Sequence, residues 1–186
     1  MNRKGGSGKS TSCTYLAQCF HNAGKSVICL DYDPDQSLLK WYESGVLPFE
    51  VVPGNPDDLD NEVSKLDHDY ILLDTPPNDE SIVLKAASIA DECLVVLAAT
   101  ALDASRLFTT LRSIATMERV RNQPLSSVVI TKAKTNTNIL ESTKSILGDN
   151  NVPICDTTIK DSVKYQGFVT PIYLEEYQAL IEELEL

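Results

Sequence analysis

Short apolar runs alternate with amphipathic stretches along the whole chain. Six of these runs are predicted to be strands: Val27–Leu30, Glu50–Val52, Tyr70–Leu73, Leu94–Leu97, Val128–Ile130 and Pro153–Cys155. Short, nearly continuous apolar runs are typical of parallel strands that are buried on both faces. The sequence therefore predicts an α/β fold, in which helices cover both faces of a mostly parallel sheet.

The stretches between the runs have the spacing of helices that bury one face. The predicted helices are Ser10–Ala23, Gln36–Ser44, Asp57–Leu66, Ser81–Ala90, Ala104–Val120, Asn138–Leu147 and Leu174–Glu185. Gly24 is placed to end the first helix, and Pro56 lies just ahead of the third. No repeat or long linker interrupts this order, so we expect residues 1–186 to form a single domain.

The stretch before the first predicted helix has the composition of a phosphate-binding loop. From Lys4 to Thr11 it reads K-G-G-S-G-K-S-T, with three glycines among four successive residues. Glycines let bare backbone approach a ligand closely, and the N–H groups of the following helix point at the same spot. Lys9 supplies a mobile ammonium group for the outer phosphates, and the Ser10 hydroxyl can ligate a magnesium ion bound to them.

Carboxylates follow two of the predicted strands. Asp31 and Asp33 come directly after Val27–Leu30, and Asp74 follows Tyr70–Leu73 in the segment D-T-P-P. Ligands of parallel sheets gather at the carboxyl ends of the strands. These carboxylates are therefore predicted to face a metal-bound nucleotide or an attacking water molecule. A turn with a helix cap, which also favours Asp and Pro, is the alternative interpretation.

These motifs resemble those of the ParA/MinD family of ATPases, whose deviant phosphate loop carries an additional early lysine. The resemblance covers K-G-G-x-G-K-S-T, D-x-D-P and D-x-P-P, in the family's order. It implies a three-layer P-loop NTPase fold that uses ATP and Mg²⁺. It also implies that Lys4 reaches the nucleotide of the partner subunit in a dimer, and that Asp33 positions or polarises the attacking water. Asp31 and Asp74 would lie around the magnesium with Ser10.

The resemblance supplies the set of candidate site residues. The catalytic set is Lys4, Lys9 and Asp33; the metal set is Ser10, Asp31 and Asp74; and the nucleotide-binding set is Lys4, Gly5, Gly6, Ser7, Gly8, Lys9, Ser10, Thr11, Thr131 and Lys132. Thr131 and Lys132 belong to it because they end a predicted strand where many nucleotide-binding sheets contact the base.

Two features depart from the family pattern. Asp35 is an additional residue before Gln36, where the family motif reads D-x-D-P-Q. Only Met1, Asn2 and Arg3 precede Lys4, and three residues cannot form the buried strand that normally fixes a phosphate loop. We therefore expect the first strand to be absent, through a coding start placed too late, a trimmed chain or a genuine loss. A genuine loss would weaken nucleotide binding.

The net charge of −11 disfavours attraction of the whole surface to DNA. Between Arg106 and Lys134, however, six basic residues face a single acid, Glu118. This local patch could bind DNA phosphates without reading sequence, and its alternative is a solvated helix face with dimer contacts. The candidate DNA-binding residues are Arg112, Arg119, Arg121 and Lys134.

Within the family, the short chain is most similar to small plasmid ParA partition proteins. This implies a homodimer when ATP is bound, non-specific DNA binding, and release by hydrolysis that a ParB-like centromere-binding partner stimulates. The acidic amphipathic stretch from Tyr173 to Leu186 would be repelled by anionic lipid, so we expect no membrane partner. The five scattered cysteines are typical of reduced residues in a cytoplasmic protein. The resemblance further implies association with the nucleoid when ATP is bound.

Two other functions remain open. One is a MinD-like positioning ATPase on a membrane or protein scaffold, which would bind DNA in no nucleotide state. The other is an interaction protein that has lost nucleotide binding, which the absent first strand suggests.

Overall fold

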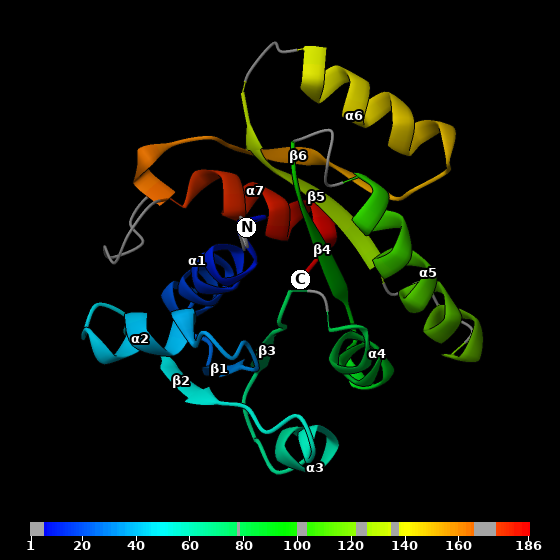
Figure 1. Cartoon of the computed structure of the whole chain (residues 1–186). Coiled ribbons are helices and arrows are strands. Elements are labelled where there is room, and N and C mark those ends of the chain that lie inside the picture. Colours follow the sequence, from blue (N-terminus) through cyan, green and yellow to red (C-terminus); the bar gives the residue numbers. More distant parts are fainter. Residues whose placement is uncertain (1–5, 78, 100–103, 122–125, 135–137, 166–173) are drawn as a thin grey trace.

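The structure is a computed structural model that describes residues 6–77, 79–99, 104–121, 126–134, 138–165 and 174–186 (Figure 1). Helices and strands alternate through these residues. The strands are β1 (Val27–Asp31), β2 (Glu50–Pro53), β3 (Tyr70–Asp74), β4 (Cys93–Ala98), β5 (Ser126–Ala133) and β6 (Ile154–Lys160). The helices are α1 (Lys9–Asn22), α2 (Ser37–Glu43), α3 (Leu59–Val63), α4 (Glu80–Ile89), α5 (Ala104–Arg121), α6 (Asn138–Asp149) and α7 (Glu175–Leu184), with a 3₁₀ turn η1 (Val163–Tyr165).

The strands form two parallel sheets of three strands each, in the orders β2-β1-β3 and β4-β5-β6. In the first sheet the register runs from Val27 beside Tyr70 to Asp31 beside Asp74, so these two aspartates end neighbouring strands side by side. In the second sheet Ala98 lies beside Thr131. Residues 6–8, the described residues before α1, form no strand, and the predicted absence of a first strand stays a prediction.

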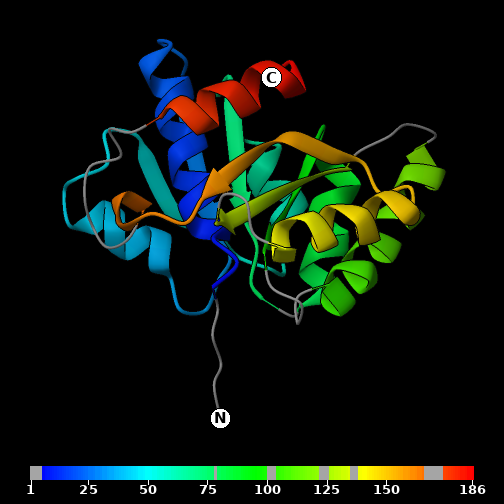
Figure 2. The same ribbon diagram turned by 90° about the horizontal axis from the view of Figure 1, so that it is seen from above.

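Helices cover both faces of the two sheets. On one face, α1 packs against both sheets at once, because its side chains share one core with Cys29 of β1 and with Val129 and Ile159 of the second sheet. On the opposite face, α4 packs Ile82 and Ala86 against residues of the first sheet and α3, and Ala87 against Ile114 of α5. The two sheets are therefore halves of one three-layer arrangement, joined by α1 and α4 (Figures 1 and 2).

The strands β3 and β4 border the junction between the two sheets. Each pairs on one side only within the described residues, β3 with β1 and β4 with β5. Their apolar residues, from Tyr70 to Leu73 and from Cys93 to Val96, are only half-buried, whereas every residue of β1 is buried. Interior strands of a parallel sheet are normally buried on both faces. The strands β3 and β4 at the junction are thus less covered than the interior strand β1.

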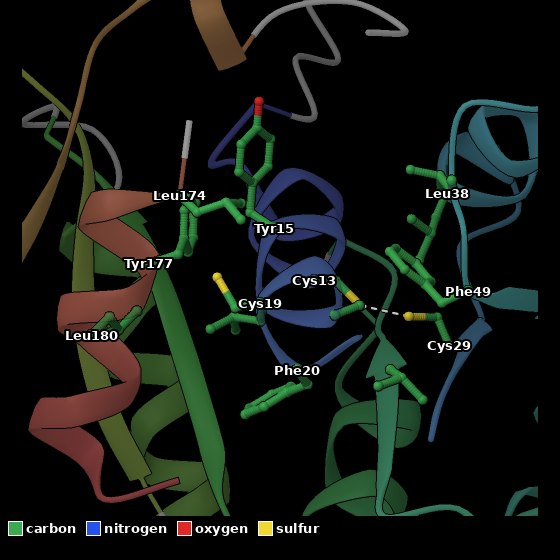
Figure 3. Close-up of a cluster of buried hydrophobic side chains, with 14 of the residues drawn as sticks. Cys13, Tyr15, Cys19, Phe20, Cys29, Leu38, Phe49, Leu174, Tyr177 and Leu180 are labelled. Carbon is green, nitrogen blue, oxygen red and sulfur yellow. Dashed lines mark hydrogen bonds between the residues drawn. The ribbon is translucent and has the colours of Figure 1, made fainter. Parts of the chain in front are cut away.

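The C-terminal helix α7 is docked on α1 through its apolar face (Figure 3). The Tyr15 and Tyr177 rings stack with centroids 5.1 Å apart, and the Tyr177 hydroxyl lies 3.1 Å from the Ser12 hydroxyl. Tyr15 also donates a hydrogen bond of 2.9 Å to the Lys164 carbonyl of η1. These contacts tie the end of the chain to the helix that follows the phosphate loop.

Most predicted elements lie within a few residues of their observed bounds. The predictions were too short for β5 and β6, which extend to Ala133 and Lys160, and too long for α3, which spans Leu59–Val63. The turn η1 was not predicted. The five cysteines are free thiols, as expected of reduced residues; four of them are buried and Cys93 is half-buried.

Candidate functional site

The phosphate loop leads into α1 through a glycine in a left-handed conformation. Gly8 has a φ of 91°, a backbone region in which a side chain is strained. It precedes Lys9 at the start of a 14-residue helix whose first turn contains no acidic residue and whose N-cap makes no side-chain hydrogen bond among the described residues. The unpaired N–H groups of this turn and the positive end of the helix dipole suit an anion. Lys4 and Gly5 lie outside the described residues.

Thr131 connects the phosphate loop to the end of β5 by a hydrogen bond. Its hydroxyl donates a 2.5 Å hydrogen bond to the Ser7 carbonyl and lies 3.3 Å from the Leu97 carbonyl. A Cβ added at Gly8 would lie 3.7 Å from the same hydroxyl oxygen. The described contacts of Thr131 are thus with the loop and the end of β4. The nucleotide contacts predicted for Thr131 and the exposed Lys132 remain predictions.

Asp74 lies beside the loop with an unsatisfied carboxylate. It ends β3, is 2% exposed, and its Oδ2 atom has no hydrogen-bond partner among the described residues. Burial raises the pKa of Asp74 to about 7, while the neighbouring Ser10 hydroxyl and Lys9 ammonium favour the charged form. A buried carboxylate oxygen without a partner is costly unless a cation or water completes it.

This geometry suits a magnesium ion. Magnesium prefers oxygen ligands and keeps several water molecules, so proteins usually hold it with one or two side chains and with substrate phosphates. Ser10 and Asp74 supply such a pair next to the phosphate loop. Within the described residues, no three His, Cys, Asp or Glu side chains converge, so this part of the chain offers no cage made of protein ligands alone.

Asp31 holds the loop that carries Asp33. Its Oδ1 accepts the Asp33 N–H at 3.0 Å, and its Oδ2 accepts the N–H groups of Leu38 and Leu39 at 3.1 and 3.0 Å. Both oxygens are therefore used by backbone donors, two of them in the first turn of α2. Asp31 thus binds the first turn of α2 from the end of β1, while the N-cap residue of α2 is Gln36. The predicted place of Asp31 in the outer shell of the magnesium stays a prediction. Asp33 itself is half-buried.

The predicted DNA-binding residues do not form one patch. Arg112 and Arg119 are exposed on α5. Arg121 instead donates hydrogen bonds to the carbonyls of Ala87 and Ala90 at the end of α4. Lys134 follows the carboxyl end of β5, whereas Arg119 lies near its start, and the eight residues of β5 span roughly 25 Å. Arg119 and Lys134 therefore lie near opposite ends of β5, and the predicted binding of DNA by these residues stays a prediction.

Sequence reasoning missed Tyr32, Gly54 and Glu62, which meet beside Asp31 and Asp33. The Tyr32 hydroxyl donates to Glu62, and its ring lies against Gly54. The D-x-D-P pattern treats position 32 as variable, and Gly54 and Glu62 belong to elements far along the chain. Only the glycine that directly follows a strand was visible as a signal.

The glycine loop, the free first turn of α1 and the Ser10–Asp74 pair define the class of the protein as a nucleotide-binding P-loop fold. Comparison with known proteins gives the family. The model of the CobQ/CobB/MinD/ParA nucleotide binding domain matches residues 1–166, and the chain belongs to this family.

Relatives of known name agree with this assignment. A curated protein named Protein ParA from Rhizobium radiobacter is 29% identical over 133 residues, which cover 68% of this chain and 60% of that protein. The chain thus spans well under two thirds of its curated relative.

Solved structures share the fold. A putative plasmid partition protein of Borrelia burgdorferi bound to AMPPNP superposes with a TM-score of 0.71 and 20% identity, over 98% of this chain and 94% of that one. Cobyrinic acid a,c-diamide synthase of Mycobacterium smegmatis, with an ATP analogue and magnesium, gives 0.76 and 18%, over 100% and 93%. Among the described helices, none is both long and apolar enough to cross a membrane.

Proposed function

We propose that the protein is an ATP-binding switch ATPase of the ParA partition type. The observation that carries this proposal is the buried, half-satisfied Asp74 beside Ser10 at the phosphate loop. A family whose model matches most of the chain, and solved relatives that hold ATP analogues, support ATP with magnesium as the ligand.

Each loop residue has a distinct task in this proposal. The backbone from Gly5 to Gly8 and the first turn of α1 cradle the phosphates, and Lys9 neutralises the outer ones. Ser10 and Asp74 would hold magnesium, which when bound draws negative charge away from the transferred phosphate. The Asp33 carboxylate orients the attacking water, and Lys4 reaches the nucleotide of the second subunit.

The switch acts through a dimer. The γ-phosphate contributes the contact that differs between the two states, because it bridges the subunits in the ATP state and is lost on hydrolysis. The dimer would bind DNA non-specifically near the nucleoid through exposed basic residues such as Arg112 and Arg119. A ParB-like partner would stimulate hydrolysis and release the DNA. A relative named ParA and a plasmid partition neighbour support this assignment.

DNA binding in different nucleotide states tests the proposal. Fluorescence anisotropy of a random-sequence duplex would be measured at low salt with ATP and magnesium, with ADP and magnesium, and without nucleotide. We expect binding only with ATP and magnesium. Equal binding in all three states would contradict the switch.

The observed positions of the basic residues favour a second candidate function. Because Arg121 is used within the fold and Lys134 lies far from Arg119, the positive surface is smaller than the sequence predicted. A positioning ATPase on a protein scaffold would need no DNA surface. ATP-dependent dimerisation without DNA binding in any state would favour this function.

A further inference from the structure

Tyr32 lies between the two aspartates of the D-Y-D-P segment, yet the proposed chemistry does not use it. Its side chain is 3% exposed, and its ring lies against the backbone at Gly54, just after β2. A Cβ placed on Gly54 would come within 2.4–2.6 Å of three ring atoms, which is shorter than any real contact. Position 54 therefore has to be glycine for the ring to occupy this place.

The hydroxyl group of Tyr32 fixes the other side of the ring. It donates a 3.0 Å hydrogen bond to Oε2 of Glu62 on α3, and this oxygen also accepts the Asn55 N–H at 2.9 Å. Burial raises the pKa of the Tyr32 phenol, so the group remains a protonated donor at neutral pH. Ring and hydroxyl thus lock the end of β1 to the segment that joins β2 and α3.

The backbone around Tyr32 connects this lock to both candidate carboxylates. The Tyr32 N–H donates to the Asp74 carbonyl at 2.9 Å, and the Gly54 N–H donates to the Asp31 carbonyl at 2.9 Å. One residue further on, the Asp33 N–H is held by Asp31, and Asp33 Oδ1 accepts the Asp35 N–H at 2.9 Å. A shift of Tyr32 would move Asp33 relative to Asp74.

We propose that Tyr32, Gly54 and Glu62 form a clamp that positions Asp33 for its work on the attacking water. Tyr32 is a positioning residue: its side chain acts only through the backbone of the segment that carries Asp33. The inference rests on the proposed ATPase function. It adds that the orientation of the water-positioning carboxylate depends on the β2–α3 segment, outside the known phosphate-loop motifs. A displacement of about 1 Å at a reacting group can cost as much as a hundredfold in rate.

Two substitutions test the clamp, each with a matched control. Tyr32→Phe removes only the hydroxyl bond to Glu62, and Tyr42→Phe makes the same change on the more exposed face of α2. Gly54→Ala displaces the ring, and Val51→Ala in the same strand region lowers stability without contact with the ring. The readouts are kcat and KM for ATP, the free energy of unfolding in urea, and the amide exchange of Asp33 and Asp35.

We expect Tyr32→Phe to lower kcat about fivefold and Gly54→Ala about fiftyfold, with KM for ATP changed less than twofold. Both variants should also speed amide exchange at Asp33 and Asp35. Tyr42→Phe should change neither readout, and Val51→Ala should lower stability without the selective loss of kcat.

Other outcomes overturn the inference. If Gly54→Ala loses no more activity than Val51→Ala at equal stability, the clamp has a structural role only. If exchange at Asp33 and Asp35 is unchanged, the clamp does not hold this segment, whatever the activity. If the unsubstituted protein does not hydrolyse ATP, the proposed function fails, and with it the catalytic part of the inference, while the exchange data still decide whether the clamp orders Asp33.

Discussion

At the scale of single residues, Asp74 is buried at a cost in stability, at a position where it is proposed to hold magnesium. It is buried beside the phosphate loop, one of its oxygens has no partner in the described part of the chain, and burial raises its pKa to about 7. A carboxylate in an unfolded chain titrates near 3.8. The folded protein therefore holds this proton over a pH range in which the unfolded chain has lost it.

This difference predicts a pH-dependent cost in the nucleotide-free protein. Between about pH 4 and pH 7 the unfolded state binds fewer protons at this site, so stability falls as the pH rises through this window. Asp74→Asn removes the titration, and its advantage over the unsubstituted protein should grow by roughly 1 kcal/mol per pH unit across the window and then level off. Urea unfolding at several pH values measures it. An advantage that does not vary with pH would contradict the assigned pKa.

Asp33 is predicted to act on turnover and not on binding. Asp33→Ala should leave ATP binding intact and lower hydrolysis by about a hundredfold or more, which traps the ATP-bound dimer. Single-turnover hydrolysis and size-exclusion chromatography would measure the two effects. Faster hydrolysis in this variant would overturn the assignment.

At the scale of elements, α4 and α5 are joined by Arg121. Its guanidinium donates to carbonyls at the end of α4, a helix end that otherwise leaves acceptors unpaired. Arg121→Ala should therefore lower the free energy of unfolding by about 1–3 kcal/mol with little effect on DNA affinity. The exposed Arg119 is the matched control, since Arg119→Ala should weaken DNA binding at unchanged stability. A loss of DNA affinity in Arg121→Ala at unchanged stability would instead assign Arg121 to the DNA-binding surface.

The two strands at the junction are predicted to exchange their amides faster than the strands beside them. In a parallel strand alternate residues point their N–H groups to opposite sides. The Tyr70 N–H and the Asp74 carbonyl point to β1, so the N–H groups of Ile71 and Leu73 point to the junction. By the same reasoning, the N–H groups of Leu94 and Val96 in β4 also point to the junction. Hydrogen exchange should find these four amides less protected than those of Cys29 and Val129. Equal protection would show that the junction is closed.

The pattern of apolar residues predicted most elements because helix and strand periods are local properties of the sequence. The lengths of β5 and β6 depended on pairing between distant segments, and so their ends were misplaced. Arg121 was assigned to DNA because its charge is visible in the sequence, whereas its carbonyl partners lie 31 and 34 residues away. Ser10 and Asp74 could be proposed as site residues because they belong to motifs with a fixed spacing. The contact between Tyr32 and Gly54 has no such sequence motif.

For the whole molecule, the account predicts that ATP brings two copies together through Lys4. Lys4→Ala should bind ATP as the unsubstituted protein does but should stay monomeric, because the contact to the opposite nucleotide is gone. Sedimentation with ATP and magnesium would measure this, with Lys25→Ala, an exposed lysine after α1, as the control. A Lys4→Ala protein that still dimerises with ATP would refute the crossing role.

Nucleotide binding itself is the most direct test of the central claim. Fluorescent ATP would be titrated with the protein in the presence and absence of magnesium, and the titration would be repeated with Lys9→Ala and Asp74→Ala. The account predicts binding that magnesium strengthens, that Lys9→Ala abolishes, and that loses its magnesium dependence in Asp74→Ala. No binding by the unsubstituted protein, or equal binding by Lys9→Ala, would contradict a phosphate-loop switch.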